Sequence, residues 1–271
     1  MSKLIGIPDK EEEIERWVGH ALVPDTIQYA EAAGVLPFCV EGGRIHVLLG
    51  CESWRHNFPR EAIGTWCDFG GSTGKRRRPI FTAAQELVEE TIGSAVRDSP
   101  LTDTIDYIRD NLYMQVLSLE GNKTPYAMFV VRIPYCNVPQ VFCHRHRVAR
   151  RFRNSDNSCS HPQREQLKRV QPYCFHPTSG RVRRHYLEKD SVQWFPIESL
   201  VAACQDNSIP LRPEFARTLV RYNILKRLQE LLKKPHYHYP SSTPPVQVIN
   251  NGVIFEESRY RTDCVPPPGF G

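Results

Sequence analysis

The stretch that decides the fold runs from Gly70-Gly71-Ser72 to Thr91-Ile92-Gly93 and has Ala84-Gln85-Glu86-Leu87-Val88-Glu89-Glu90 at its centre. Pro79 fits the first turn of a helix, where its missing N–H would have no intrahelical partner. Residues 80–90 then follow an amphipathic helical pattern, with Leu87 on the apolar side. Gly93 suits the end, because glycine readily takes the left-handed conformation that closes many helices. The stretch therefore predicts a short helix over residues 80–90.

Three glutamates of this helix, Glu86, Glu89 and Glu90, share one face because they are spaced i, i+3 and i+4. Carboxylates crowded in this way repel one another unless a cation neutralises them, and oxygen ligands suit Mg²⁺ or Mn²⁺. The alternative is a solvated acidic face near a helix end. Residues 66–69 read as a short strand, so the expected order is strand, glycine turn, loop and helix. That order would bring the carboxylates beside backbone that can approach a phosphate, which favours the metal site.

The spacing of these residues resembles the Nudix box, G-x5-E-x7-R-E-U-x-E-E-x-G-U, in which U is a bulky apolar residue. The matching positions are Gly71, Glu86, Leu87, Glu89 and Glu90. Arg77 replaces the first glutamate of the box, Gln85 replaces its arginine, and the closing glycine comes one place late at Gly93. In the family the two altered residues help to hold the loop and the helix together. We therefore expect the departures to affect the geometry more than the ligand set.

The resemblance implies an α/β fold, a Nudix-like α/β/α sandwich with a mixed β-sheet. The flanks agree with it, since residues 34–37 and 45–49 resemble the family's first hairpin and residues 194–197 its late strand and helix. The metal ligands that the resemblance implies are Glu86, Glu89, Glu90 and Gly71. The catalytic residues that it implies are Glu86, Glu89 and Glu188. Glu188 is included because a glutamate on a late loop is the general base in part of the family; the alternative is an ordinary exposed glutamate.

The composition fits one large domain. With 271 residues, 40% of them hydrophobic, the chain can bury a substantial core. It has no apolar run long enough to span a membrane, and its first residues lack the apolar segment of a secretory signal. We therefore expect a cytoplasmic protein without membrane contact, and the host cytoplasm if the protein is viral. The nine cysteines are then expected to be reduced thiols or metal ligands.

Alternating and helical patterns predict the remaining elements. One hairpin is expected over residues 35–49 and another over 113–133. Helices are expected over residues 103–111, with Thr102 as the cap, over 197–203 and, from an apolar stripe, over 211–234. A strand is expected over residues 192–195.

The chain divides into a domain and a tail. Residues 1–234 are assigned to the Nudix-like domain. Residues 235–271 are rich in proline and are expected to be extended or partly disordered. Within this tail, residues 246–255 could add an edge strand around Asn250-Asn251-Gly252.

A basic insertion, residues 143–184, interrupts the proposed domain. It holds ten Arg and one Lys against one Asp and one Glu. The planar guanidinium suits phosphates, and interleaved aromatic residues add stacking surface, so RNA is the expected partner. The arginines expected to contact it are Arg181, Arg183 and Arg184. The alternative is a loose basic loop with only non-specific affinity.

The same insertion contains Cys143-His144, Cys159-Ser160-His161 and Cys174-Phe175-His176. Zinc is a further alternative for these residues, although their spacing is not that of a common zinc knuckle. Basic residues also occur inside the box-like loop: Lys75, Arg76, Arg77 and Arg78. They would either bind the substrate's phosphates or simply solvate the loop.

The favoured function is a metal-dependent hydrolase that cleaves a pyrophosphate joined to a nucleoside. Within the family, Phe69-Gly70-Gly71 resembles the loop of Nudix proteins from large DNA viruses, several of which remove the 5′ cap of mRNA. The basic insertion fits that branch, because a decapping enzyme must also hold the RNA body. One alternative is a hydrolase of dinucleoside polyphosphates or diphosphoinositol phosphates. Another is a catalytically weak RNA-binding protein, which Arg77 and Gln85 would favour.

Overall fold

The computed structural model of the chain describes residues 30–53, 62–73, 78–96, 101–118, 125–153, 162–170, 174–175, 181–233, 246–250 and 253–257. Across these ranges, nine strands form one sheet. The strands are β1 (Ala32–Glu41), β2 (Arg44–Glu52), β3 (Trp66–Cys67), β4 (Phe69–Ser72), β5 (Leu112–Ser118), β6 (Tyr126–Arg132), β7 (Lys189–Pro196), β8 (Val246–Asn250) and β9 (Val253–Glu257).

The sheet is mixed, as predicted. β1 pairs antiparallel with β2 and with β4, and parallel with β6. β5 pairs antiparallel with β6 and parallel with β8. β7 pairs antiparallel with β2, so the strand that carries Lys189 at its start lies next to the strand that ends at Glu52. This pairing brings two distant parts of the sequence to one end of the sheet.

Both predicted hairpins are confirmed. β1 and β2 join through Gly42 and Gly43, whose φ values of 56° and 74° suit a tight turn that requires the left-handed conformation twice. β5 and β6 pair antiparallel over the predicted segments, and the residues that connect them, 119–124, lie outside the described ranges.

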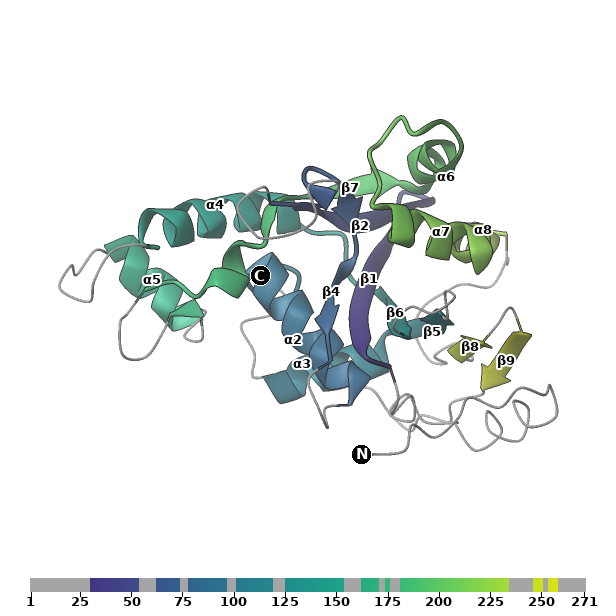
Figure 1. Ribbon diagram of the computed structural model, residues 1–271, viewed down its shortest axis with the longest axis horizontal. Coiled ribbons are helices and arrows are strands. Elements are labelled where there is room, and N and C mark those ends of the chain that lie inside the picture. The colour runs from purple at the N-terminus through teal and green to yellow at the C-terminus, as the bar shows by residue number, and fades with distance from the viewer. Residues whose placement is uncertain are drawn as a thin grey trace.

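Helices cover both faces of the sheet (Figure 1). One face carries α2 (Pro79–Thr91), α3 (Leu101–Asp110) and α4 (Val138–Arg151), and the other carries α6 (Ile197–Asp206), α7 (Pro213–Arg221) and α8 (Ile224–Leu231). Alternate strand residues feed the two cores, with Val35 and Leu48 on the α2 side and Leu36 and Leu49 on the α6 side. The architecture is therefore an α/β/α sandwich, as predicted.

The glycine pair lies in a strand and not in the predicted turn. The segment 66–69 divides into β3 and β4 at Asp68, and Gly70 and Gly71 of β4 pair with Gly34 and Ala33 of β1. A Cβ on Gly70 would lie 2.8 Å from both the Gly34 Cα and the Ala33 carbonyl oxygen, and it would also meet the Tyr126 hydroxyl. Glycine is required here because two strands and a tyrosine approach closely.

The ends of three helices differ from prediction. The helix expected over residues 211–234 is broken between α7 and α8 at Asn223, which takes a left-handed φ of 52°. Thr102 lies inside α3 and is not its cap. α2 is closed by Ile92 at φ 51°, one residue before the predicted Gly93, and Arg145 Nη1 donates to the Ile92 carbonyl at 2.9 Å.

The basic insertion contributes packed helices where the structure describes it. It spans most of α4, then α5 (Pro162–Val170), and it ends at the short helix η4 (Arg184–Leu187). Phe152, Leu167 and Phe175 join the core on the α2 side of the sheet. In Figure 1, α4 and α5 extend to one side of the sheet, beyond α2. The alternative of a loose basic loop is therefore wrong for these residues.

Part of the predicted tail joins the sheet. β8 and β9 pair antiparallel as a hairpin, and β8 pairs with β5, which confirms the edge strand expected over residues 246–255. The rest of the tail lies outside the described ranges. None of the described helices has the length and apolar character that a membrane span requires.

Candidate active site

Glu86 of α2 lies directly over Gly71 of β4. A Cβ on Gly71 would come within 2.6 Å of the Glu86 Cδ and would also collide with its Oε1. Any residue larger than glycine would therefore push the Glu86 carboxylate away from the strand. This explains Gly71 by a contact with one of the predicted glutamates, and it fixes where that glutamate lies.

Glu86, Glu89 and Glu188 act on one another electrostatically. The first two lie on α2, and Glu188 lies between η4 and β7. The pKa of Glu86 is raised to about 7, first by burial and then by the charges of Glu89 and Glu188. Burial also raises the pKa of Glu188, against the opposing effect of His185, whose Nδ1 is 3.6 Å from the Glu188 Oε1. The structure thus brings the three predicted catalytic carboxylates into one group.

Gln85, one of the two departures from the box, contacts this group. Its Nε2 donates to the Glu89 Oε1 at 2.8 Å. A neutral amide at this position orients Glu89 and adds no charge to the group. The other departure, Arg77, lies outside the described residues, together with Lys75 and Arg76.

Glu90 is buried and already has partners, although it too was predicted to be a metal ligand. Only 2% of it is exposed. Its Oε2 accepts the Gly70 backbone N–H at 2.9 Å, and its Oε1 is 3.1 Å from the Lys189 Nζ. Burial raises its pKa well above the ordinary value, Lys189 opposes this, and the Glu52 charge adds to it. Glu90 therefore faces a cation that belongs to the chain.

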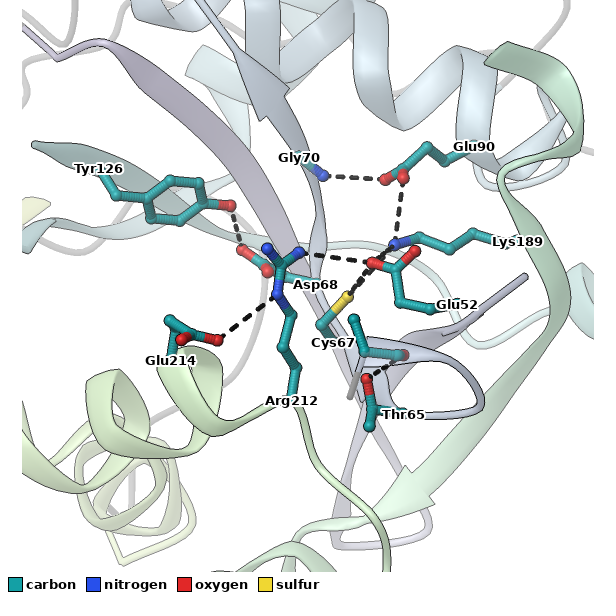
Figure 2. A network of polar contacts seen from close by, with 11 residues as sticks. Glu52, Thr65, Cys67, Asp68, Gly70, Glu90, Tyr126, Lys189, Arg212 and Glu214 are labelled. Atoms are coloured by element: carbon teal, nitrogen blue, oxygen red, sulfur yellow. Dashed lines mark hydrogen bonds and ion pairs between the residues drawn. The ribbon is translucent and has the colours of Figure 1, made fainter. Parts of the chain in front are cut away.

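Lys189 is the centre of a buried polar network (Figure 2). Its Nζ lies 2.8 Å from the Glu52 Oε1 and 3.2 Å from the Cys67 Sγ, in addition to its contact with Glu90. The Cys67 thiol donates to the Glu52 Oε1 at 3.0 Å. Burial would lower the pKa of Lys189, but Cys67, Glu90 and Glu52 raise it well above the ordinary value. Lys189 is therefore protonated at neutral pH.

A second cation extends the network towards the surface. The Arg212 Nη1 is 3.5 Å from the Glu52 Oε1, and its Nε is 3.7 Å from the Glu214 Oε2. Nearby, the Tyr126 hydroxyl donates to the Asp68 Oδ2 at 2.5 Å. Burial raises the pKa of Asp68, whereas Tyr126, Lys189 and Arg212 act to lower it. Figure 2 shows these groups converging from β3, β6, β7 and the start of α7.

The donor chemistry of the Glu86, Glu89 and Glu188 group fits a divalent metal ion. Carboxylate oxygens are hard ligands. After burial, the charges of Glu89 and Glu188 raise the pKa of Glu86, and a cation would relieve this repulsion. Within the described ranges, however, no three His, Cys, Asp or Glu side chains are arranged closely enough to hold a metal ion. Side-chain rotation would be needed to bring these carboxylates onto one ion.

The predicted phosphate-binding arginines lie near this group in part. Arg78 immediately precedes α2, as its N-cap. Arg183 and Arg184 lie at the start of η4, a helix that packs against α2, and the Arg183 N–H donates to the Cys174 carbonyl at 2.8 Å. Arg181 is exposed two residues earlier. One border of the carboxylate group is therefore basic.

The zinc alternative gains no support from the residues that can be placed. Cys174 is buried, and burial raises its pKa, which disfavours the thiolate that zinc binds. Cys143 is exposed on α4. Cys159, His161 and His176 lie outside the described residues.

Sequence reasoning missed the network around Lys189. No role was predicted for Glu52, Cys67 or Lys189 from the sequence. The Lys189 and Glu52 partners are 137 positions apart in the chain, so no local spacing could reveal them. The residues next to Lys189 in sequence, Glu188, Asp190 and Ser191, are polar and gave no sign that it is buried.

No protein-family model matches the chain, and no curated protein sequence matches it. Among solved structures, it is similar to a Nudix hydrolase from M. smegmatis, RenU, with 16% identity over 76% of this chain and 88% of that one, at a TM-score of 0.37. The NUDIX domain of Shewanella oneidensis NrtR complexed with ADP ribose has 14% identity over 74% of this chain and 86% of that one, at a TM-score of 0.37. A C. elegans Ap4A hydrolase has 11% identity over 74% of this chain and 98% of that one, also at a TM-score of 0.37. All three are distant similarities.

Proposed function

We propose that the protein is a Nudix-type hydrolase that cleaves a pyrophosphate linkage attached to a nucleoside, with the 5′ cap of mRNA as its substrate and Mg²⁺ or Mn²⁺ as its cofactor. One observation carries this proposal: the grouping of Glu86, Glu89 and Glu188, drawn from two distant elements, with Glu86 directly over Gly71. Crowded acidic side chains raise their own pKa values, and such costly arrangements are concentrated at functional sites. The resemblance of the sequence to the Nudix box supports pyrophosphate hydrolysis as the reaction.

Glu86, Glu89 and Glu188 would hold the metal ion. When bound, a divalent cation neutralises charge on the phosphate oxygens and lowers the pKa of a coordinated water. Glu86 or Glu188 would accept a proton from the attacking water. Gln85 would keep Glu89 oriented through its 2.8 Å hydrogen bond.

The basic border of the site favours an RNA substrate over a small one. Arg181, Arg183 and Arg184 come just before Glu188 in sequence, and η4 packs against the helix that carries Glu86. An RNA chain whose cap enters the carboxylate group would leave its body over these arginines and over α4. Phosphates bound there release counterions and supply affinity independent of sequence.

A substrate panel tests the proposal. Purified protein is incubated with Mg²⁺ or Mn²⁺ and with capped RNA, diadenosine polyphosphates, diphosphoinositol phosphates or nucleoside triphosphates. We expect release of the cap nucleotide, inhibition of that release by uncapped RNA, and loss of activity in Glu86→Gln. Rapid hydrolysis of a small substrate together with no effect of uncapped RNA would identify the small-molecule alternative.

A second candidate, an RNA-binding protein with little or no turnover, is favoured by the pairing of Glu90 with Lys189. A fixed ammonium on one predicted ligand reduces the negative charge available to metal ions. This candidate predicts tight, salt-sensitive binding of RNA and no cap release above that of Glu86→Gln. The same substrate panel therefore separates the two.

A further inference from the structure

Lys189 lies in the protein interior, where the neighbouring strand leaves space for its side chain. Its side chain is 1% exposed. The methylene groups of its stem lie over Gly50 of β2, where a Cβ would come within 2.9 Å of the Lys189 Cγ and Cδ. Glycine at position 50 therefore leaves the groove along which the lysine stem runs. The β2–β7 pairing fixes both residues, since Gly50 lies opposite Val192 in the register.

The ammonium lies between two buried carboxylates. It contacts the Glu52 Oε1 at 2.8 Å and the Glu90 Oε1 at 3.1 Å, from a strand and a helix on different sides of it. The other oxygen of Glu90 is engaged by the Gly70 N–H at 2.9 Å. Both oxygens of Glu90 are thus engaged, and a metal ion that approached the Oε1 would meet the charge of the Lys189 ammonium.

We propose that Lys189 is a built-in cation that replaces a divalent metal ion at Glu90, so that the metal-binding group of this protein is Glu86, Glu89 and Glu188 without Glu90. Displacing the ammonium would leave it unpaired in a buried space, which is strongly unfavourable. The second half of the statement rests on the proposed function. The first half, replacement of a metal at Glu90 and Glu52, does not.

Binding of Mn²⁺ to the full chain, followed by electron paramagnetic resonance at neutral pH, tests the proposal. In Glu90→Gln we expect the same number of Mn²⁺ sites as in the native protein and an affinity within about threefold, because the charge removed was already neutralised by Lys189. Glu86→Gln is the matched variant on the same helix, and there we expect affinity to fall by about tenfold or more. A tenfold loss in Glu90→Gln, or loss of a site, would overturn the proposal.

Replacing Lys189 provides an independent test. In Lys189→Met, Glu52 and Glu90 lose the ammonium between them, while Arg212 remains 3.5 Å from Glu52. The buried Glu52 Oε2, which has no hydrogen-bond partner among the described residues, becomes available as a further metal ligand. We expect this variant to gain a Mn²⁺ site absent from the native protein and to show a larger rise in melting temperature with Mn²⁺ than the native protein does. No gain on either measure would overturn the proposal.

The two tests separate this inference from the proposed function. If the native protein binds no Mn²⁺ and Lys189→Met does, the built-in cation is supported and the metal-dependent hydrolase is not. If Lys189→Met fails to fold without metal, refolding in the presence and absence of Mn²⁺ replaces the melting experiment. Recovery of folded protein only with Mn²⁺ supports the proposal, and equal failure in both overturns it.

Discussion

Helix α2 carries two sets of carboxylates that differ in what neutralises them. Glu86 and Glu89 face Glu188, and no Lys or Arg of the described ranges forms an ion pair with these three residues. Glu90, the next residue along the helix, is enclosed with Lys189 and the Gly70 N–H. We call Glu86, Glu89 and Glu188 the open group, because no ion pair with a described Lys or Arg neutralises them, and Glu90 with Lys189 the closed pair. Neighbouring positions of one helix therefore belong to the open group and to the closed pair. Helical spacing places charges, but it does not decide which of them remain available to a ligand.

The largest expected effect is the loss of stability when the closed pair of Glu90 and Lys189 is broken. Lys189→Met leaves Glu52 and Glu90 buried without their ammonium, and breaking a buried pair in this way costs about 3–5 kcal/mol of unfolding free energy. Urea unfolding without metal measures it. The matched control is Lys226→Met on α8, an exposed lysine, which should change stability by no more than about 0.5 kcal/mol. A loss below about 1 kcal/mol for Lys189→Met would mean that the pair is not closed, because its carboxylates find other partners.

The second effect is a difference in stability between substitutions at Gly34, which faces backbone atoms, and at Gly71, which faces a side chain. A Cβ on Gly34 would meet the Phe69 carbonyl oxygen at 2.6 Å and the Gly70 Cα at 2.9 Å, both of them backbone atoms that cannot move away. Gly34→Ala should therefore cost about 3 kcal/mol of stability. A Cβ on Gly71 meets the end of the Glu86 side chain, which can rotate.

Gly71→Ala should consequently cost only about 1 kcal/mol of unfolding free energy but should displace Glu86 from the open group. We expect metal affinity and cap release to fall while the melting curve changes little. Denaturation and Mn²⁺ titration of both variants check this contrast. Equal destabilisation by the two substitutions would show that Glu86 is held rigidly, as Glu90 is.

The third effect concerns the basic border of the open side. Changing Arg181, Arg183 and Arg184 together to Ala should reduce the slope of log K against log salt for single-stranded RNA by about 2, since each phosphate contact contributes roughly 0.7. The control removes three exposed cations on the opposite face of the sheet: Arg217, Arg221 and Lys226. An identical change of slope in both triple variants would assign the effect to net charge and not to this border.

The smallest effect is a pH dependence of stability. The pKa of Glu86 is about 7 in the folded protein against an ordinary value of 4.5, so the folded state binds more protons between these values. The Glu86 contribution to stability is therefore present at pH values below this window and is lost as the pH rises through it. The full shift corresponds to about 3 kcal/mol, and partial exposure reduces this to about 1 kcal/mol.

Unfolding free energies measured from acidic to neutral pH should show this loss. Glu86→Gln should remove that part of the decline with rising pH, whereas Glu198→Gln, on an exposed position of α6, should not. A native profile that is no steeper than that of Glu86→Gln would show that the pKa of Glu86 is not raised in the folded protein.

Much of the local structure could be predicted because it depends on neighbours in sequence. α2 follows from Pro79 and the apolar side with Leu87, and the first hairpin follows from Gly42-Gly43 between two apolar runs. The helix break at Asn223 was not predicted, because the apolar stripe continues across it and only packing on the sheet rewards two shorter helices. The ends of α2 and α3 were misplaced by one or two residues.

The sequence by itself determined the first hairpin, the helix α2 and the presence of three glutamates on one helical face, since these depend on periodicities of two and 3.6 residues. The mixed α/β class was implied by the resemblance of the box-like stretch. Only the tertiary structure decided which glutamates stay open. The β2–β7 pairing places Lys189 beside Glu52, and the packing of α2 on β4 places Glu90 above it. A buried ammonium interacts with the carboxylates that lie close to it in space. Lys189 and Glu52 are 137 positions apart in the chain, so local sequence spacing cannot reveal their contact.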